Sequence, residues 1–230
     1  MVNKLSSEEI SILLEMRIFA YSFLKHALYI EPSREFLKAV IENNAVESFP
    51  FTEKSELINE GIIQINSFLK ENNVLEISEY EKLHWDYTRM FIGPNSLPVP
   101  PWESVYLNKD RLVFQKETFE VRKNYLKYYF ISKNYPREPD DHIGIELDFM
   151  CRLNKIAMEN NEIQNTNKLL EVLNDQESFL REHILKWIPD FSISMINSSN
   201  TEFYRGIAKI LKGYVEVDYL ILKELIERST

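Results

Sequence analysis

The sequence contains little glycine and a single cysteine, and both shortages narrow the classes of protein it can belong to. Only 5 of its 230 residues are glycine, whereas all-β chains with many tight turns need more, so the shortage favours helices. Cys151 is the only cysteine. No disulfide can therefore form within the chain, which fits a reducing compartment.

Targeting and membrane signals are missing as well. The first residues, Met1 to Glu9, do not form a basic region followed by an apolar run, so we predict no secretory signal. No stretch approaches the roughly 18 consecutive apolar residues that a membrane span requires. We therefore expect a cytoplasmic protein without stable membrane insertion.

Positive charge is also in short supply. The formal net charge is −9, and an acidic chain repels nucleic acid phosphates, so we do not expect a nucleic acid partner. The same charge would attract a basic peptide. The simpler explanation is that the acidity only keeps the protein soluble.

Motifs for catalysis and metal binding are almost absent. The sequence has no phosphate loop, no Gly-x-Ser-x-Gly, no Cys-x-x-Cys and no His-Glu-x-x-His. Glu81 and His84 match the Glu-x-x-His spacing of di-iron bundles, but such a site needs a second copy, and there is none. We predict no catalytic residue, no metal and no cofactor, and hence no enzyme. The alternative is a helical metal-binding enzyme that uses Glu81, His84 and His142.

What the chain does have is helical periodicity over most of its length. Ser6 and Glu9 have the spacing of a capping box in front of the first apolar stripe. Apolar spacing predicts helices over residues 10–29, 33–41, 52–71, 80–91, 111–130, 140–159, 167–187 and 203–225, and a further helical stretch after Trp102. A proline-rich connector at 93–101 and a second break at 134–139 interrupt the pattern, and Pro189 should end a helix. We predict an all-α, multi-helix globule in a single domain over residues 1–230.

The first candidate functional segment is the proline-rich connector with Trp102 at its end. A proline-dense segment is stiff, so it loses little entropy on binding a partner. Trp102 combines a large apolar face with one hydrogen-bond donor, as binding anchors do. The simpler explanation is that Trp102 fills the core where the connector ends.

The second candidate segment runs from Glu138 to Met150. We expect Pro139 in the first turn of a helix, with Asp140 and Asp141 complementing the positive end of its dipole. His142 and Glu146 are four residues apart and so share one face, at the edge of an apolar stripe. Carboxylates beside apolar surface suit a ligand with a guanidinium at one end and an apolar segment at the other. A satisfied His–Glu pair on a solvated helix start is the simpler alternative.

Together the two segments resemble the TorD/DmsD family of cytoplasmic redox enzyme maturation chaperones. The second segment opens its helix with Glu138-Pro139-Asp140-Asp141-His142, and upstream lie Phe91-Ile92-Gly93-Pro94 and Pro101-Trp102-Glu103-Ser104-Val105-Tyr106. The last of these is closest to the dimethyl sulfoxide reductase chaperone branch. The resemblance in these motifs covers about a third of the chain. Over the remainder, the predicted helices, the length and the acidity agree with the family.

The resemblance implies a chaperone that binds the twin-arginine signal peptide of an apo molybdoenzyme of the dimethyl sulfoxide reductase class. It would hold that oxidoreductase until the molybdenum cofactor is inserted, before export. Carried over to matching positions, with Glu146 added from its spacing, the predicted peptide-binding residues are Trp102, Pro101, Glu138, Asp141, His142, Glu146, Tyr87 and Phe91. The resemblance allows a monomer or a domain-swapped dimer. A generic interaction module for another basic partner is the remaining alternative.

Overall fold

The computed structural model describes residues 4–94, 96–132 and 134–229; Met1 to Asn3, Asn95, Lys133 and Thr230 lie outside this part. The described residues form α-helices and no strand, which confirms the all-α prediction. The helices are α1 (Ser7–Tyr29), α2 (Arg34–Glu42), α3 (Glu56–Glu71), α4 (Ile77–Phe91), α5 (Glu103–Leu107), α6 (Lys116–Lys127), α7 (Ile143–Glu162), α8 (Thr166–Phe179), α9 (Leu185–Ser198) and α10 (Glu202–Ser229).

Serine side chains begin the first three α-helices. At α1, the Glu9 backbone N–H donates to Ser6 Oγ at 3.2 Å, and the Ser6 backbone N–H donates to Glu9 Oε2 at 2.8 Å. This reciprocal pair is the predicted capping box, and it satisfies donors that have no partner inside the helix. Ser33 caps α2 and Ser55 caps α3 in the same way, each with one side-chain acceptor.

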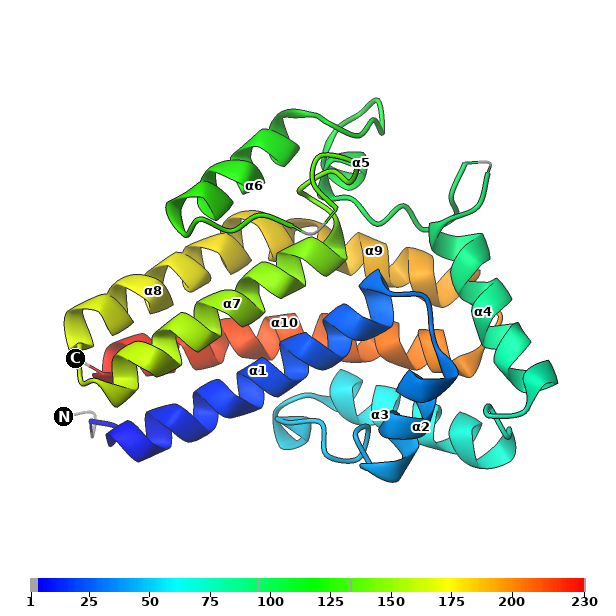
Figure 1. Ribbon diagram of the computed structural model, residues 1–230, viewed down its shortest axis with the longest axis horizontal. Coiled ribbons are helices and arrows are strands. Elements are labelled where there is room, and N and C mark those ends of the chain that lie inside the picture. The colour runs from blue at the N-terminus through cyan, green and yellow to red at the C-terminus, as the bar shows by residue number, and fades with distance from the viewer. Residues whose placement is uncertain (1–3, 95, 133, 230) are drawn as a thin grey trace.

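The long C-terminal helix α10 lies in the middle of the helical assembly (Figure 1). It packs against α3, α8 and α9, while α7 packs against α1 and α8. Gly61 of α3 and Gly206 of α10 allow a close crossing, because a Cβ added to either one would lie 2.6–2.7 Å from the carbonyl oxygen of the other. The short helices α5 and α6 lie together above this assembly in the view of Figure 1.

A buried ion pair joins α1, α7 and α10 inside the core. Arg17 donates from Nε to Asp218 Oδ1 at 2.6 Å and from Nη1 to Asn154 Oδ1 at 2.6 Å. Tyr21 donates its hydroxyl to Asp218 Oδ2 at 2.6 Å. Both charged side chains are fully buried, and the proximity of Asp218 raises the pKa of Arg17 against the opposing effect of burial. A buried charge needs such partners, so the three helices are held in one arrangement.

Several predicted helix boundaries were wrong; α4 begins three residues earlier than predicted and α10 ends four residues later. The helix predicted over 111–130 is shorter, because Arg111, Phe114 and Tyr129 adopt left-handed backbone angles that a right-handed helix excludes. The helix predicted from residue 140 begins at Ile143, with His142 as its N-cap. Pro189 does not end a helix: it lies inside α9, which directly follows a π-helical turn, Leu180–Ile184.

Candidate functional site

A short backbone bridge joins the two candidate segments. Trp102 and His142 pair in an isolated antiparallel bridge. The Ile143 N–H donates to the Pro101 carbonyl at 2.9 Å, and the Glu103 N–H donates to the Asp141 carbonyl at 3.0 Å. The end of the proline-rich connector is therefore fixed against the start of α7. The structure thus brings together five predicted site residues, namely Pro101, Trp102, Glu138, Asp141 and His142.

Trp102 and Glu138 form the outer part of this site. The indole Nε1–H donates to Glu138 Oε1 at 2.8 Å, and the Trp102 ring meets the His142 ring edge-on with centroids 6.0 Å apart. Both Trp102 and Glu138 are half-buried. Partial burial raises the pKa of Glu138, although the indole donor opposes that shift. A carboxylate held at the rim in this way gains from a cationic ligand, which would compensate for the water it has lost.

His142 is a neutral group that orders the backbone. Its Nδ1 accepts the Gly144 N–H at 3.0 Å, so its proton is on Nε2. The Tyr29 ring packs against it with centroids 5.1 Å apart, and burial lowers the pKa of His142 to about 3. An uncharged imidazole at this position does not repel a cationic ligand, and its Nε2–H can donate to a carbonyl oxygen.

Asp140 and Asp141, which we predicted to complement the positive end of the helix dipole, make tertiary contacts in the structure. Asp140 forms an ion pair with Arg122 of α6. Asp141 is fully buried, and its Oδ2 accepts the Ser104 N–H at 2.9 Å, while Oδ1 has no partner in the described part of the chain. These contacts hold the start of α7 against α5 and α6. Because Trp102 directly precedes α5, they also help to position Trp102.

Glu146 lies behind the site in a buried carboxylate cluster that it forms with Glu103 and Asp141. It is fully buried, not at the edge of an apolar stripe as predicted, and Trp187 Nε1 donates to its Oε2 at 3.2 Å. Burial and the nearby carboxylates of Glu103 and Asp141 raise the pKa of Glu146 well above its ordinary value. Glu103 in turn contacts His183 Nδ1 of the π-helical turn at 3.0 Å. Because Glu103 directly follows Trp102 in the sequence, the cluster adjoins the site at Trp102.

Tyr87 and Phe91 pack in the core, where their rings contact each other and Tyr204. Tyr87 is buried and donates its hydroxyl to the Leu28 carbonyl at 3.3 Å. Burial raises the pKa of Tyr87, and the carboxylates of Glu31 and Glu138 raise it further. Sequence reasoning missed Glu31. In the sequence, Glu31 stands out only because it lies between the first predicted helix and Pro32, and that position by itself indicates no function.

A surface depression, the connector groove, runs along the proline-rich connector. Its first part, of about 450 Å³, includes Trp102, Val105 and Leu112. Its second part, of about 380 Å³, includes Trp85 and Thr88 of α4. Ser96 and Leu97 line both parts, so the two adjoin at these residues. The groove therefore offers apolar surface that starts at Trp102 and follows the connector back to α4.

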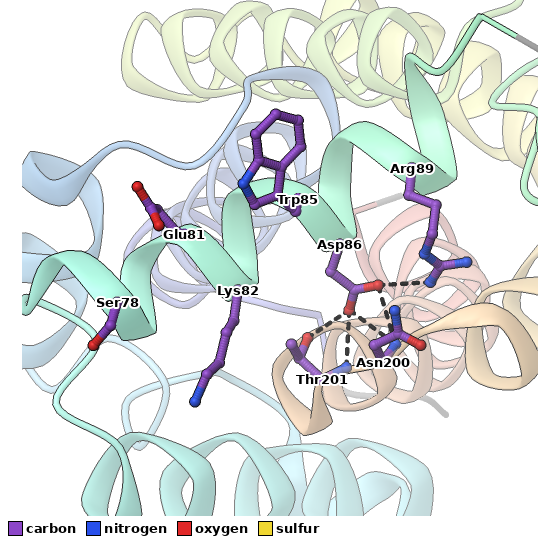
Figure 2. Close-up of a pocket in the computed structure, with 8 residues that line it drawn as sticks. All are labelled: Ser78, Glu81, Lys82, Trp85, Asp86, Arg89, Asn200 and Thr201. Atoms are coloured by element: carbon purple, nitrogen blue, oxygen red, sulfur yellow. Dashed lines mark hydrogen bonds and ion pairs between the residues drawn. The ribbon is translucent and has the colours of Figure 1, made fainter.

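A neighbouring hollow on α4 shows how that end of the groove is fixed. Figure 2 shows Asp86 pointing from α4 toward Asn200 and Thr201, which precede α10. Asp86 Oδ2 accepts the Thr201 N–H at 2.8 Å and the Asn200 N–H at 3.0 Å, and Oδ1 pairs with Arg89 at 2.7 Å. Trp85 points away from this network and is 62% exposed. The α4 end of the connector is therefore held rigidly while an aromatic side chain remains available at the surface.

Neither a metal centre nor a membrane-spanning helix is found in the part of the chain that the structure describes. There, no three histidine, cysteine, aspartate or glutamate side chains converge as a metal ion would require. His84 contacts Glu31 instead, with Nδ1 3.0 Å from Oε1. Over the same residues, no helix combines the length and apolar character needed to cross a bilayer.

Comparison with known proteins identifies the class of this helical chain. A sequence profile of the family described as nitrate reductase delta subunit matches residues 53–192. The chain is 29% identical over 171 residues to the chaperone protein TorD of Aliivibrio fischeri, covering 74% of this chain and 75% of that protein. It is 29% identical over 144 residues to a probable Tat proofreading chaperone DmsD of Haemophilus influenzae, covering 63% and 64%. A crystal structure described as a redox enzyme maturation protein from Archaeoglobus fulgidus aligns over 88% of this chain and 93% of that one, with 19% identity and a TM-score of 0.46.

The chain therefore belongs to the TorD/DmsD family of redox enzyme maturation chaperones, as the sequence motifs had implied. Its relatives are chaperones and not enzymes. The prediction that it lies closest to the dimethyl sulfoxide reductase branch stays a prediction, because relatives of both names match at the same identity.

Proposed function

We propose that this protein binds the twin-arginine signal peptide of an apo molybdoenzyme in the cytoplasm and holds that client until its cofactor is inserted, before export. The observation that carries the proposal is the contact between Trp102 and Glu138. It places a half-buried carboxylate beside an indole ring at the end of an apolar groove. A twin-arginine signal carries guanidinium groups followed by an apolar segment, and these two surfaces match that order of chemistry.

Each part of the site has a stated task in this proposal. Glu138 binds a guanidinium by a charge-assisted hydrogen bond, which provides specificity more than affinity. Trp102 and the connector groove cover the apolar segment, and burial of that segment provides most of the affinity. His142 donates from Nε2 to a peptide carbonyl, while Pro101 and Asp141 hold Trp102 in place.

The remaining predicted site residues act from beneath the surface. Tyr87 and Phe91, buried on α4, support the α4 end of the connector from the core, and Glu146 supports the site through Trp187. In this proposal residues 1–230 act as a single chaperone domain, as a monomer or a domain-swapped dimer. The client class is the molybdenum oxidoreductases, with the dimethyl sulfoxide reductase class as the first candidates.

The test is calorimetric titration of the full chain with synthetic signal peptides from molybdoenzymes, each paired with an arginine-to-glutamine control peptide. We expect one peptide to bind tightly and its control to bind at least about tenfold more weakly, which is the 1.4 kcal/mol of a single charge-assisted contact. Trp102→Ala should weaken binding by a similar factor or more. Phe119→Ala, which removes an exposed aromatic ring of α6 outside the groove, is the matched control for loss of an aromatic side chain. Unchanged binding by a folded Trp102→Ala variant would show that the groove is elsewhere.

A further inference from the structure

The segment of residues 111–137 is basic, although the chain as a whole is acidic. It contains seven lysine and arginine residues and two acidic residues, a formal charge of +5, whereas the whole chain carries −9. The segment comprises α6 and the turns on either side of it, and α6 lies above the helical assembly in the view of Figure 1. A basic segment of this kind repels a cationic peptide and attracts an acidic one.

A small apolar hollow, which we call the α6 hollow, lies within this basic segment. It has a volume of about 150 Å³ and is lined by Arg122, Tyr125, Leu126, Phe130, Ile131, Tyr135 and Asp140. Three of its apolar side chains are open to solvent, since Leu126 is 63%, Ile131 71% and Tyr135 48% exposed. A cavity of this size holds one group such as a benzene ring. The hollow therefore suits a single side chain of a partner better than a whole small-molecule ligand.

The walls of the α6 hollow are held in place without a ligand. Tyr125 is buried and donates its hydroxyl to the Asp140 carbonyl at 2.9 Å. Its ring packs against that of Phe130, with centroids 4.9 Å apart. Asp140 also pairs with Arg122, whose guanidinium carbon lies 4.9 Å from the centre of the Tyr135 ring. Because these side chains are already ordered, little further ordering is needed when a partner binds.

Two cations beside the hollow are available to an acidic ligand. Lys123 lies one helical turn from Leu126 on α6, and Arg137 follows Tyr135 by two positions; both cations are exposed. Among the described residues, no carboxylate forms an ion pair with either cation. Lys127 of the same helix, by contrast, is paired with carboxylates of α8, so its charge is already compensated.

The shape of this surface favours an acidic protein segment over an anionic membrane. A helix that lies on a membrane has apolar side chains along its outer face. The side of α6 opposite the buried Val121 and Tyr125 is polar instead. It carries Lys116, Glu120 and Lys123. The exposed apolar side chains therefore do not form the continuous outer face that a bilayer requires, whereas the hollow matches one anchoring side chain.

From these observations we infer that the α6 hollow is a second docking site, which binds an acidic segment of a partner protein. One leucine or phenylalanine side chain of that segment fills the hollow, and neighbouring aspartate or glutamate residues pair with Lys123 and Arg137. The α6 hollow and the connector groove therefore select ligands of opposite charge. This inference goes beyond the proposed function and does not depend on a twin-arginine ligand.

Selection of peptides from a random displayed library, with the full chain as bait, tests the α6 hollow. We expect counter-selection on Ile131→Glu to leave peptides that combine acidic residues with one leucine or phenylalanine. In calorimetric titration, a synthetic peptide of such a sequence should bind Ile131→Glu at least about tenfold more weakly, because this variant places a carboxylate in the hollow. Ile163→Glu, the same change at an exposed position after α7, is the matched control.

The two cations are tested with the same acidic peptide. Lys123→Gln combined with Arg137→Gln should weaken its binding about fivefold at low salt, and high salt should remove most of that difference. Lys54→Gln combined with Lys70→Gln removes the same charge near the two ends of α3, which lies across the assembly from α6 in Figure 1, and should have no effect. Trp102→Ala should bind the acidic peptide normally, so the α6 hollow and the proposed function fail or succeed separately.

Three kinds of result would overturn the inference. The first is a selection that enriches no peptide, enriches basic peptides, or enriches peptides that bind Ile131→Glu as tightly as the wild type. The second is sedimentation of the protein with vesicles that contain anionic lipid, lost in Ile131→Glu and kept in Ile163→Glu, which would assign the hollow to a membrane surface. The third is concentration-dependent self-association that the same variant abolishes, which would assign the hollow to a second copy of this chain.

Discussion

At the scale of one residue, the stability of the protein depends on a proton that the buried Glu146 carboxyl keeps. Its carboxyl is fully buried beside Glu103 and Asp141, and its Oε1 lacks a partner in the described structure. Burial, and then the two neighbouring acids, raise its pKa. The folded protein therefore keeps a proton that the unfolded chain releases at about pH 4.5. Stability contributed by this proton is present at acidic pH and is lost as pH rises through the raised pKa.

Glu146→Gln should make the protein more stable above neutral pH. The amide is neutral at every pH, its oxygen can accept from Trp187, and its NH₂ can donate toward Glu103. We expect the variant to exceed the wild type by about 1 kcal/mol or more at pH 8, and to match it near pH 4. Urea denaturation at a series of pH values measures the difference. His142 and Glu103 titrate in both proteins, so parallel pH curves would contradict the raised pKa of Glu146.

At the scale of helices, Gly144 sets the distance between α1 and α7. A Cβ at this position would lie 2.1 Å from Cβ of Tyr29. Tyr29 packs against His142, and His142 pairs with Trp102. The distance between α1 and α7 therefore affects the rim of the site through the contacts of Tyr29 with His142 and of His142 with Trp102.

Gly144→Ala should therefore destabilise the protein even though alanine favours helices. The clash requires α1 or the Tyr29 side chain to move, which costs roughly 1–3 kcal/mol, against a gain of roughly 1 kcal/mol in helix propensity. Thermal unfolding measures the balance, and Trp102 fluorescence reports whether the rim moves. Gly93→Ala is the control, since its Cβ would meet neighbours only at 3.7 Å. If the two variants were equally stable, the close approach would be unimportant.

The sequence predicted the long helices well and their junctions poorly. The starts and stripes of α1 and α10 follow from local signals, namely the Ser6–Glu9 capping box and an unbroken apolar periodicity. The start of α7 was wrong by three residues, because Asp141 pairs with the Ser104 backbone, a partner 37 positions away that local spacing does not reveal. Such tertiary contacts override propensity.

The candidate site was predictable only in part, for the same reason. Trp102, Glu138 and His142 came from a family resemblance, and the structure brings them into contact. The expectation that His142 and Glu146 share one face came from spacing, but spacing did not reveal that Glu146 contacts Trp187, a residue of α9. Glu31 had no local signal at all, since its contacts are with Thr88 and His84 of α4, more than 50 positions away.

At the scale of the whole molecule, the net charge of −9 should govern how quickly a basic ligand arrives. An acidic surface raises the encounter rate with a cationic peptide, and salt screens that attraction. Contacts inside the groove are partly desolvated and therefore less sensitive to salt.

We expect the association rate of a twin-arginine peptide to fall several-fold between about 50 and about 500 mM salt, with a smaller change in its dissociation rate. Stopped-flow measurement of tryptophan fluorescence would separate the two rates. The peptide with both arginines replaced by glutamine should show a weaker dependence. Salt sensitivity confined to dissociation would mean that overall charge does not direct the encounter.

The buried carboxylate cluster also limits the order in which this sequence can change over evolution. Of Glu103, Asp141 and Glu146, only Glu103 contacts a histidine, with His183 Nδ1 3.0 Å from its Oε2, and this contact opposes the rise in the pKa of Glu103 that burial causes. Loss of His183 alone would leave Glu103 without this contact beside two further acids, and repulsion among buried carboxylates makes that change costly. Loss of the Glu146 carboxylate first would relieve that repulsion, so His183 could then be replaced at lower cost. Lineages should therefore lose the acid before the histidine, and the two substitutions should be strongly epistatic.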